Sequence, residues 1–117
     1  MRLLISGDRN WKNKPLIKDT ITYLFPEIVI QGGAPGADKI ASTEAKNLGI
    51  EVLEFKAEWD RYGKGAGPIR NQKMIDEGKP DLIVAFHDDI TKSSGTADML
   101  IKAAENNIYY CIVMNWY

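Results

Sequence analysis

Residues 27–55 read EIVIQGGAPGADKIASTEAKNLGIEVLEF, and this stretch carries the pattern on which the fold prediction rests. Two short apolar runs, 27–30 and 51–55, flank a glycine turn and a polar segment. Gly49 stands where a left-handed residue ends a helix. The apolar positions of the polar segment recur at helical spacing: Ala37, Ile40, Ala41, Ala45 and Leu48. The stretch therefore predicts a strand, a helix and a second strand.

The same alternation continues in both directions along the chain. Further apolar runs at 3–5, 81–86 and 109–114 predict three more strands. Helices are expected from Pro15 to Leu24, from Pro68 to about Glu77, and around the stripe formed by Ala97, Leu100, Ile101 and Ala104. Strands that alternate with helices predict α/β class: a single Rossmann-like, doubly wound domain over residues 1–117, with a five-stranded parallel sheet and helices on both faces.

Composition narrows the classes of protein that the chain can belong to. Its 117 residues are 44% hydrophobic and 26% charged, with a formal net charge of −1, so one ordered domain is expected and bulk nucleic-acid binding is disfavoured. Cys111, the single cysteine, is expected to be a buried, reduced thiol, which excludes a disulfide scaffold and fits a cytoplasmic protein. No apolar run suits a membrane span or a signal peptide.

The unusual residues of the chain follow four of the predicted strands, at 6–9, 32–38, 56–71 and 93–96. The carboxyl ends of parallel strands lie at one edge of a sheet, where open α/β folds bind their ligands. The thirteen-residue connection 56–68 is long for a compact domain, and such loops are usually functional. These four segments are therefore predicted to form one ligand site.

Two of the segments combine glycine with the start of a helix. Gly32, Gly33 and Gly36 could let backbone N–H groups approach a phosphate, although a tight turn capped by Asp38 explains the glycines equally well. Gly95-Thr96 predicts a second positive helix end. The alternative at this second position is ordinary N-capping by Ser94 or Thr96.

Segment 56–74, KAEWDRYGKGAGPIRNQKM, mixes cations with aromatic rings, a combination that suits a nucleotide. Arg70 offers a planar fork for phosphate, and Lys64 a mobile point charge. Trp59 is expected to be a buried anchor of the loop rather than a stacking platform. Arg9, directly after the first strand, is expected to point into the crevice, unless it pairs with Asp8 or a neighbouring acid.

Other patterns that suggest chemistry are weaker. Residues 87–89, His-Asp-Asp, could suggest a metal site, but adjacent side chains do not converge easily on one ion and the chain has no second histidine, so a solvated turn is expected. No Ser-His-Asp set or Cys-His pair is spaced for nucleophilic catalysis. Neither a metal nor a cofactor is predicted.

Four motifs in order carry a resemblance that spans nearly the whole chain: residues 6–9, GGAPGAD, AEWDRYGKGAGPIRNQKM and GTADM. Together they resemble the small YspA-like branch of the SLOG superfamily, Rossmann-like domains related to the Smf/DprA proteins and the LOG phosphoribohydrolases. The resemblance implies a nucleotide or nucleotide-derived ligand. The residues that match the family's motifs are Gly32, Gly33, Gly36 and Asp38 in the first turn, the pair Arg70-Asn71, and Gly95 and Thr96 in the second turn.

One position departs from the LOG enzymes, whose second motif ends in a glutamate that works with an arginine. Arg70 resembles that arginine, but Met99 occupies the place of the glutamate, and Asp98 lies one position early, rotated by about 100° around a helix. The candidate catalytic residues are Arg70 and Asp98. The predicted ligand-binding residues are Ser6, Gly7, Arg9, Gly32, Gly33, Gly36, Asp38, Lys64, Arg70, Asn71, Gly95 and Thr96.

The leading hypothesis is a sensor domain that binds an adenine nucleotide or an ADP-ribose-like molecule. One alternative is a LOG-like enzyme that cleaves the N-glycosidic bond of a nucleoside monophosphate, and the sequence leaves open whether any turnover occurs. A second alternative is a DprA-like binder of single-stranded DNA, which the net charge disfavours. Self-association is expected from the resemblance and from the apolar run Tyr109–Tyr117, which includes Trp116.

Overall fold

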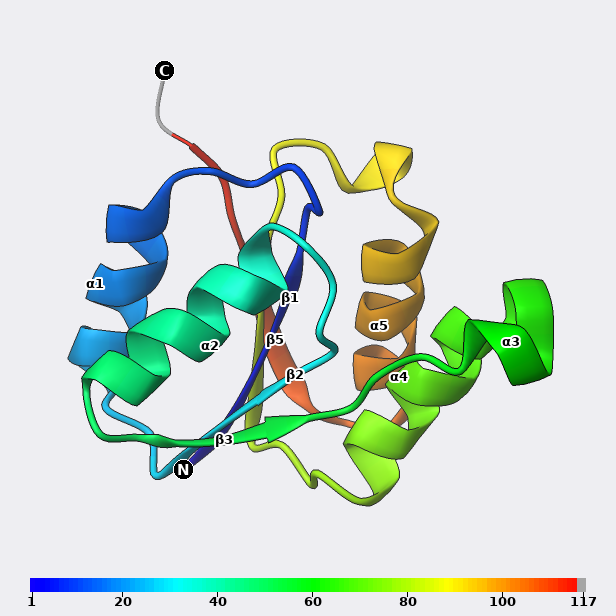
Figure 1. The fold of residues 1–117 in the computed structure, drawn as a ribbon, viewed down its shortest axis with the longest axis horizontal. Helices are drawn as coiled ribbons and strands as arrows, with labels where there is room; N and C mark the ends of the chain where they lie inside the picture. The colour runs from blue at the N-terminus through cyan, green and yellow to red at the C-terminus, as the bar shows by residue number, and fades with distance from the viewer. Residues whose placement is uncertain (116–117) are drawn as a thin grey trace.

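Five parallel strands form one sheet in the order β3-β2-β1-β4-β5 (Figure 1). The computed structural model describes residues 1–115, so Trp116 and Tyr117 lie outside the described residues. The strands are β1 (Arg2–Gly7), β2 (Ile28–Gln31), β3 (Glu51–Glu54), β4 (Leu82–Phe86) and β5 (Tyr109–Val113). The helices are α1 (Lys14–Leu24), α2 (Ala37–Asn47), α3 (Trp59–Tyr62), α4 (Ala66–Asp76) and α5 (Ser94–Glu105), with 3₁₀ turns η1 (Gly63–Gly65) and η2 (Ile90–Lys92).

The helices cover both faces of the sheet, because consecutive residues of each buried strand are apolar and point to opposite faces. On one face, α1 and α2 pack against Leu3, Ile5 and Val29; on the other, α4 and α5 pack against Leu4 and Ile30. Strand order and layering confirm the predicted doubly wound α/β fold. Within residues 1–115, no helix is both long and apolar enough to cross a bilayer.

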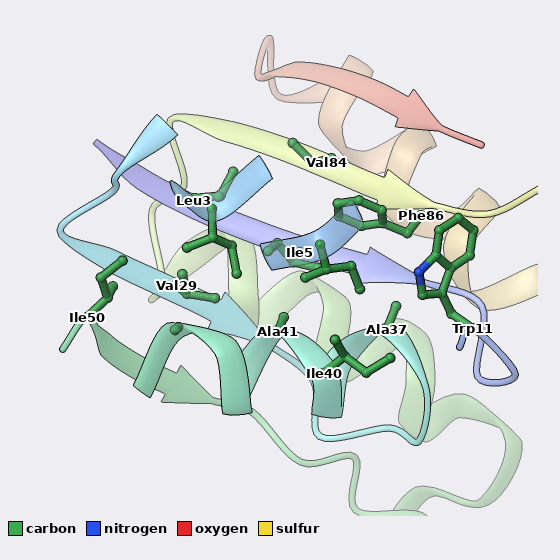
Figure 2. Packing of buried hydrophobic residues seen from close by; sticks show 13 residues of the cluster. Leu3, Ile5, Trp11, Val29, Ala37, Ile40, Ala41, Ile50, Val84 and Phe86 are labelled. Atoms are coloured by element: carbon green, nitrogen blue, oxygen red, sulfur yellow. The ribbon is translucent and has the colours of Figure 1, made fainter. Parts of the chain in front are cut away.

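The tryptophan that anchors the core is Trp11, in the β1–α1 connection. It is 4% exposed and packs edge-to-face on Phe86, with ring centroids 5.6 Å apart (Figure 2). Trp59, by contrast, is 59% exposed, so the expectation of a buried anchor at that position is wrong. Trp59 lies over the start of α4, where a Cβ at Gly67 would lie 3.5 Å from its ring. The loop needs no buried anchor because it folds locally.

That local folding also corrects the extent of the third predicted helix. Residues 59–65 form α3 and η1, and α4 begins at Ala66 rather than at Pro68. Pro68 is therefore the third residue of α4, inside the first turn, where a missing backbone N–H breaks no helical hydrogen bond. The connection is a helical arm, not an irregular loop, and Figure 1 shows α3 projecting from the body of the domain.

Strand β5 is an edge of the sheet and is more exposed than its apolar sequence predicts. Cys111 is exposed, so the expected burial of its thiol is wrong. Cys111 is paired in register with Val84, whose side chain belongs to the core beneath α1 and α2. Tyr109, on the same face of β5, is 83% exposed, which shows that the helical cover ends before this strand.

Candidate functional site

Four segments meet at the carboxyl edge of the sheet, as the sequence predicted. A Cβ on Gly36 would overlap the backbone of Asp8 and Arg9, so the β2–α2 turn touches the β1–α1 loop. Arg70 of α4 donates from Nη1 to the carbonyl of Gly32 over 2.7 Å. The N-terminal ends of α2, α4 and α5 thus face a common region (Figure 1).

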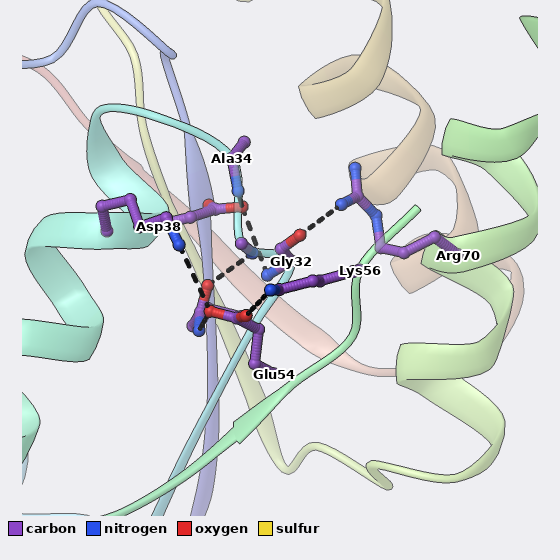
Figure 3. Close-up of polar contacts among 9 residues, drawn as sticks. Gly32, Ala34, Asp38, Glu54, Lys56 and Arg70 are labelled. Carbon is purple, nitrogen blue, oxygen red and sulfur yellow. Dashed lines mark hydrogen bonds and ion pairs between the residues drawn. The ribbon is translucent and has the colours of Figure 1, made fainter. Parts of the chain in front are cut away.

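Side chains of the protein itself cap the glycine turn. Oδ2 of Asp38 accepts hydrogen bonds from the N–H groups of Gly32 and Ala34, each over 3.2 Å (Figure 3). The Gly33 N–H donates over 2.5 Å to Oε1 of Gln31. The predicted capping by Asp38 is confirmed. Because these three N–H groups are already paired, this turn does not hold them ready for a phosphate in the conformation described.

Steric contacts explain why the turn contains glycine. A Cβ on Gly32 would overlap the guanidinium group of Arg70 and lie 3.0 Å from Oδ2 of Asp38. Gly36 adopts φ 77°, a left-handed conformation that glycine tolerates best, and directly precedes α2. The absence of side chains at Gly32 and Gly36 therefore leaves room for the Arg70 guanidinium and for the β1–α1 loop.

Asp38 is a buried carboxyl group, only 7% exposed. Burial raises the pKa of Asp38 from its ordinary 3.8 to about 6; the N–H groups of Ala34 and Gly32 and the positive charge of Arg70 oppose this rise. Burial also lowers the pKa of Arg70, against the pull of the Asp38 charge. The Asp38 carboxyl group and the Arg70 guanidinium therefore both lie beside the glycine turn, where they are partly removed from solvent.

Arg70 connects the first turn to the second. Its Nε donates over 3.0 Å to Oδ1 of the neighbouring Asn71, and Nη1 holds the Gly32 carbonyl. A guanidinium group has five N–H donors, and within residues 1–115 these bonds engage two of them. The half-buried cation therefore keeps donors for a further acceptor.

Asn71 extends this network to α5. The buried amide donates from Nδ2 to the Gly95 carbonyl over 3.2 Å and to Oδ2 of Asp98 over 3.0 Å. Asp98 also forms an ion pair with Lys102, whose Nζ lies 2.7 and 2.8 Å from its two carboxylate oxygens. Met99, one position later, is fully buried in the core beneath α4 and α5. Asp98 thus reaches the site, whereas Met99 points away from it.

The second turn begins one residue earlier than the expected caps. Ser93, in extended conformation, is the N-cap of α5, and its Oγ accepts a hydrogen bond from the Thr96 N–H over 3.2 Å. Capping by Ser94 or Thr96 is therefore wrong; Thr96 is buried and bonded through its hydroxyl to Ser93. Gly95 is exposed, and among the described residues beyond its chain neighbours and the backbone of its own helix, no heavy atom lies within 4 Å of where its Cβ would be.

Four predicted residues lie outside this network. Ser6 is paired in register with Ala85, and a Cβ on Gly7 would overlap the carbonyl of Phe86, so both contribute to joining β1 to β4. Arg9 is exposed just after β1, and within residues 1–115 the alternative of an ion pair with Asp8 or a neighbouring acid is absent. Lys64 is exposed on η1.

Comparisons with known proteins show the family and the fold of this chain. The sequence model of the family "YspA, cpYpsA-related SLOG family" matches residues 1–62, which is more than half of the 117 residues. The chain belongs to this SLOG family. Its matched part includes the first turn, Gly32–Asp38, whereas Arg70 and Gly95 lie beyond it.

Two further proteins resemble this SLOG chain. The Gene 61 protein of Mycobacterium phage D29 is 32% identical over 117 residues, covering 92% of this chain and 91% of that protein. The X-ray structure of DNA processing protein A (DprA) from Streptococcus pneumoniae superposes with a TM-score of 0.60 at 13% identity, over 94% of this chain and 58% of that one. At this identity the structural similarity shows the fold alone.

Gln31 and Glu54 are two site residues of this SLOG domain that sequence reasoning missed. Fully buried Gln31 ends β2 and bonds both Gly33 and Glu54, while Glu54 ends β3. For Gln31 the available indication was a polar residue that closes an otherwise apolar strand directly before a glycine turn; Glu54 carried no such signal.

Two other places at this edge are less suited to the predicted ligand. His87 is buried rather than solvated, and its Nδ1 accepts the Asp89 N–H over 2.9 Å; among residues 1–115, no group of three or more His, Cys, Asp or Glu could hold a metal. A hollow of about 500 Å³ lies beside the β1–α1 loop. Its lining contains no predicted ligand-binding residue: Asp8, Asn10, Trp11, Lys12, Asn13, Asp88 and Asn115.

Proposed function

We propose that this SLOG-family domain binds a nucleotide or nucleotide-derived ligand, an adenine nucleotide or an ADP-ribose-like molecule, and acts as a ligand sensor in the cytoplasm. The observation that carries the proposal is the position of Arg70. Its half-buried guanidinium lies between the two glycine turns, holds the Gly32 carbonyl and keeps further donors for an anion.

The second turn and the β1–α1 loop support an anionic ligand. Gly95 lies in the first turn of α5, where unpaired backbone N–H groups favour negative charge, and open space surrounds it. Arg9 adds an exposed cation in the loop that follows the central strand. Since Asp38 and Gln31 already engage the first turn, the phosphate is expected between Arg70 and Gly95.

The geometry favours binding over glycosidic hydrolysis. Met99, which stands where the LOG enzymes have a catalytic glutamate, is enclosed in the core. The Asp98 carboxylate is engaged by Lys102 and Asn71, so it is not positioned as a spare acid or base. The net charge of −1 gives no support for bulk binding to nucleic acid.

The proposal is tested by calorimetry with AMP, ADP and ADP-ribose on the wild type and on Arg70→Ala. Charge-assisted hydrogen bonds contribute about 1.5–3 kcal/mol each, so Arg70→Ala should raise the Kd about tenfold or more. Lys18→Ala, which removes one exposed positive charge from α1, is the matched control and should leave the Kd unchanged.

A second variant separates geometry from charge. Arg70→Lys keeps the charge but lacks the planar fork, and is expected to bind more weakly than the wild type. Thermal melts establish that each variant is folded. If the wild type binds none of the three compounds, or if folded Arg70→Ala binds as tightly as the wild type, this account of the site is wrong.

We also propose that the domain associates with a second copy of itself through β5. This edge strand contains no charged residue and no proline, and its exposed side chains include Tyr109, Tyr110 and Ile112. Edge strands of monomers usually carry charges or prolines that block pairing. Sedimentation velocity of Ile112→Lys, beside the wild type, should show loss of the larger species; a wild type that stays monomeric at high concentration contradicts the proposal.

A further inference from the structure

Glu54 occupies a place in the fold that suggests a role in ligand recognition. Strand β2, the glycine turn, α2 and β3 form one βαβ unit, and Glu54 is the last residue of β3. In dinucleotide-binding folds, an acidic residue at the end of the strand after the glycine turn, about 20 residues on, accepts the ribose hydroxyls. Here the same relation between turn and acid occurs one strand farther from the centre of the sheet.

The Glu54 carboxylate is fixed against the glycine turn. The buried Gln31 side chain donates from Nε2 to Oε1 of Glu54 over 2.8 Å, and its own Oε1 accepts the Gly33 N–H. A Cβ on Gly33, whose φ is 75°, would lie 3.1 Å from Cδ of Glu54. The glycine turn and the Glu54 carboxylate are therefore in contact. Figure 3 shows Lys56 on the same side of Gly32 as Glu54.

Glu54 keeps capacity to accept further hydrogen bonds. The hydrogen bond from Gln31, and then the charges of Lys39 and Lys56, hold the pKa of Glu54 below its usual value despite partial burial. The two ammonium groups lie 3.7 and 3.6 Å from the carboxylate, beyond hydrogen-bond distance, and both lysines are exposed. A carboxylate has about four lone-pair sites, and one firm hydrogen bond from Gln31 leaves others for hydroxyl groups.

We propose that the Glu54 carboxylate accepts the ribose hydroxyls of the bound nucleotide, and that the domain thereby selects ribonucleotides over 2′-deoxyribonucleotides. This inference rests on the proposed function. It also sets the orientation of the ligand. A phosphate is repelled by Glu54 and attracted by Arg70, so the sugar lies towards the end of β3 and the phosphate towards α5.

The test compares the affinities of ADP and 2′-deoxy-ADP by calorimetry for the wild type, Glu54→Gln and Glu54→Ala. The wild type should bind ADP about tenfold or more tightly than 2′-deoxy-ADP, because a hydroxyl-to-carboxylate hydrogen bond is lost with the deoxy sugar. Glu54→Gln should shrink this ratio and Glu54→Ala should bring it close to one. Glu51→Gln, at the exposed opposite end of the same strand, should keep the wild-type ratio.

The ratio separates recognition from a purely structural role. If Glu54 served only to hold Gln31 and the turn, its replacement would weaken both nucleotides equally and leave the ratio intact, which would overturn the inference. Equal affinity of the wild type for both nucleotides overturns it too, while the proposed function stands. If the wild type binds neither nucleotide, the proposed function fails and takes this inference with it.

Discussion

Replacing Asp38 by asparagine should change how the stability of the domain depends on pH. The asparagine side chain has the same shape and an amide oxygen that can accept the N–H groups of Gly32 and Ala34, but it cannot ionise. In the wild type, burial raises the pKa of Asp38 from 3.8 to about 6. The substitution therefore removes one buried ionisation and leaves the cap of the turn in place.

The sign and size of the effect follow from proton linkage. Between pH 3.8 and about 6, the folded protein binds more protons at Asp38 than the unfolded chain does, so this group lowers stability as the pH rises through that window. At about 1.4 kcal/mol per pKa unit, the decrease amounts to about 3 kcal/mol above pH 6. Relative to the wild type, Asp38→Asn should therefore gain about 2.5 kcal/mol between pH 4 and pH 7.5, because the unfolded carboxyl group is already more than half ionised at pH 4.

Urea unfolding at pH 4 and pH 7.5 measures this difference. For a slope of about 1–3 kcal/mol per molar, the gain corresponds to a relative shift of about 1–3 M in the midpoint. The lowered pKa of Glu54 acts in the opposite direction, but it is common to both proteins and cancels. Asp19→Asn, at an exposed position on α1, is the control. A wild-type-to-variant difference that is the same at both pH values would refute the reasoning.

Three further substitutions test the positions of individual side chains. Gly36→Val should destabilise the domain by about 3 kcal/mol or more in urea unfolding, because φ is 77° and the new side chain overlaps the β1–α1 loop; a small loss would contradict the described turn. Met99→Glu buries a carboxylate in the core and should lower the unfolding midpoint without releasing free base from AMP in a chromatographic assay, whereas a folded variant that releases base would revive the hydrolase hypothesis. Trp59→Ala should cost less than about 1 kcal/mol and Trp11→Ala about 3–5 kcal/mol, and equal losses would show that the exposures are misassigned.

The strands and helices could be predicted because the apolar periodicity of each element is visible in the residues of that element alone. The ranges 3–5 and 81–86 fall on β1 and β4, and helix α2 ends where Gly49 takes a left-handed conformation. Burial of a single large side chain depends instead on which element packs above it. The apolar pattern therefore predicts neither the exposure of Trp59 nor the burial of Trp11.

The sequence predicted the edge at which the candidate segments meet and the capping of the first turn by Asp38, but not the other hydrogen bonds of the site. Strand order brings the glycine turns and Arg70 to one edge, which the alternation of strands and helices already implies. The partners of the first turn come from Asp38, in the following helix, and from Gln31, whose amide is oriented by Glu54 on the next strand. The pairing of Gln31 with Glu54 depends on register between strands, which apolar patterns do not encode.

A nitrogen-edited NMR titration of the uniformly labelled protein with ADP tests the central claim most directly, because every backbone N–H of the proposed site reports separately. The account predicts that the largest shift changes fall on Gly95 and its neighbours in the first turn of α5, on Arg70, and on the turn at residues 32–36. Absence of shift changes, or changes confined to the hollow at Asp8 to Asn13 and Asn115, would contradict it.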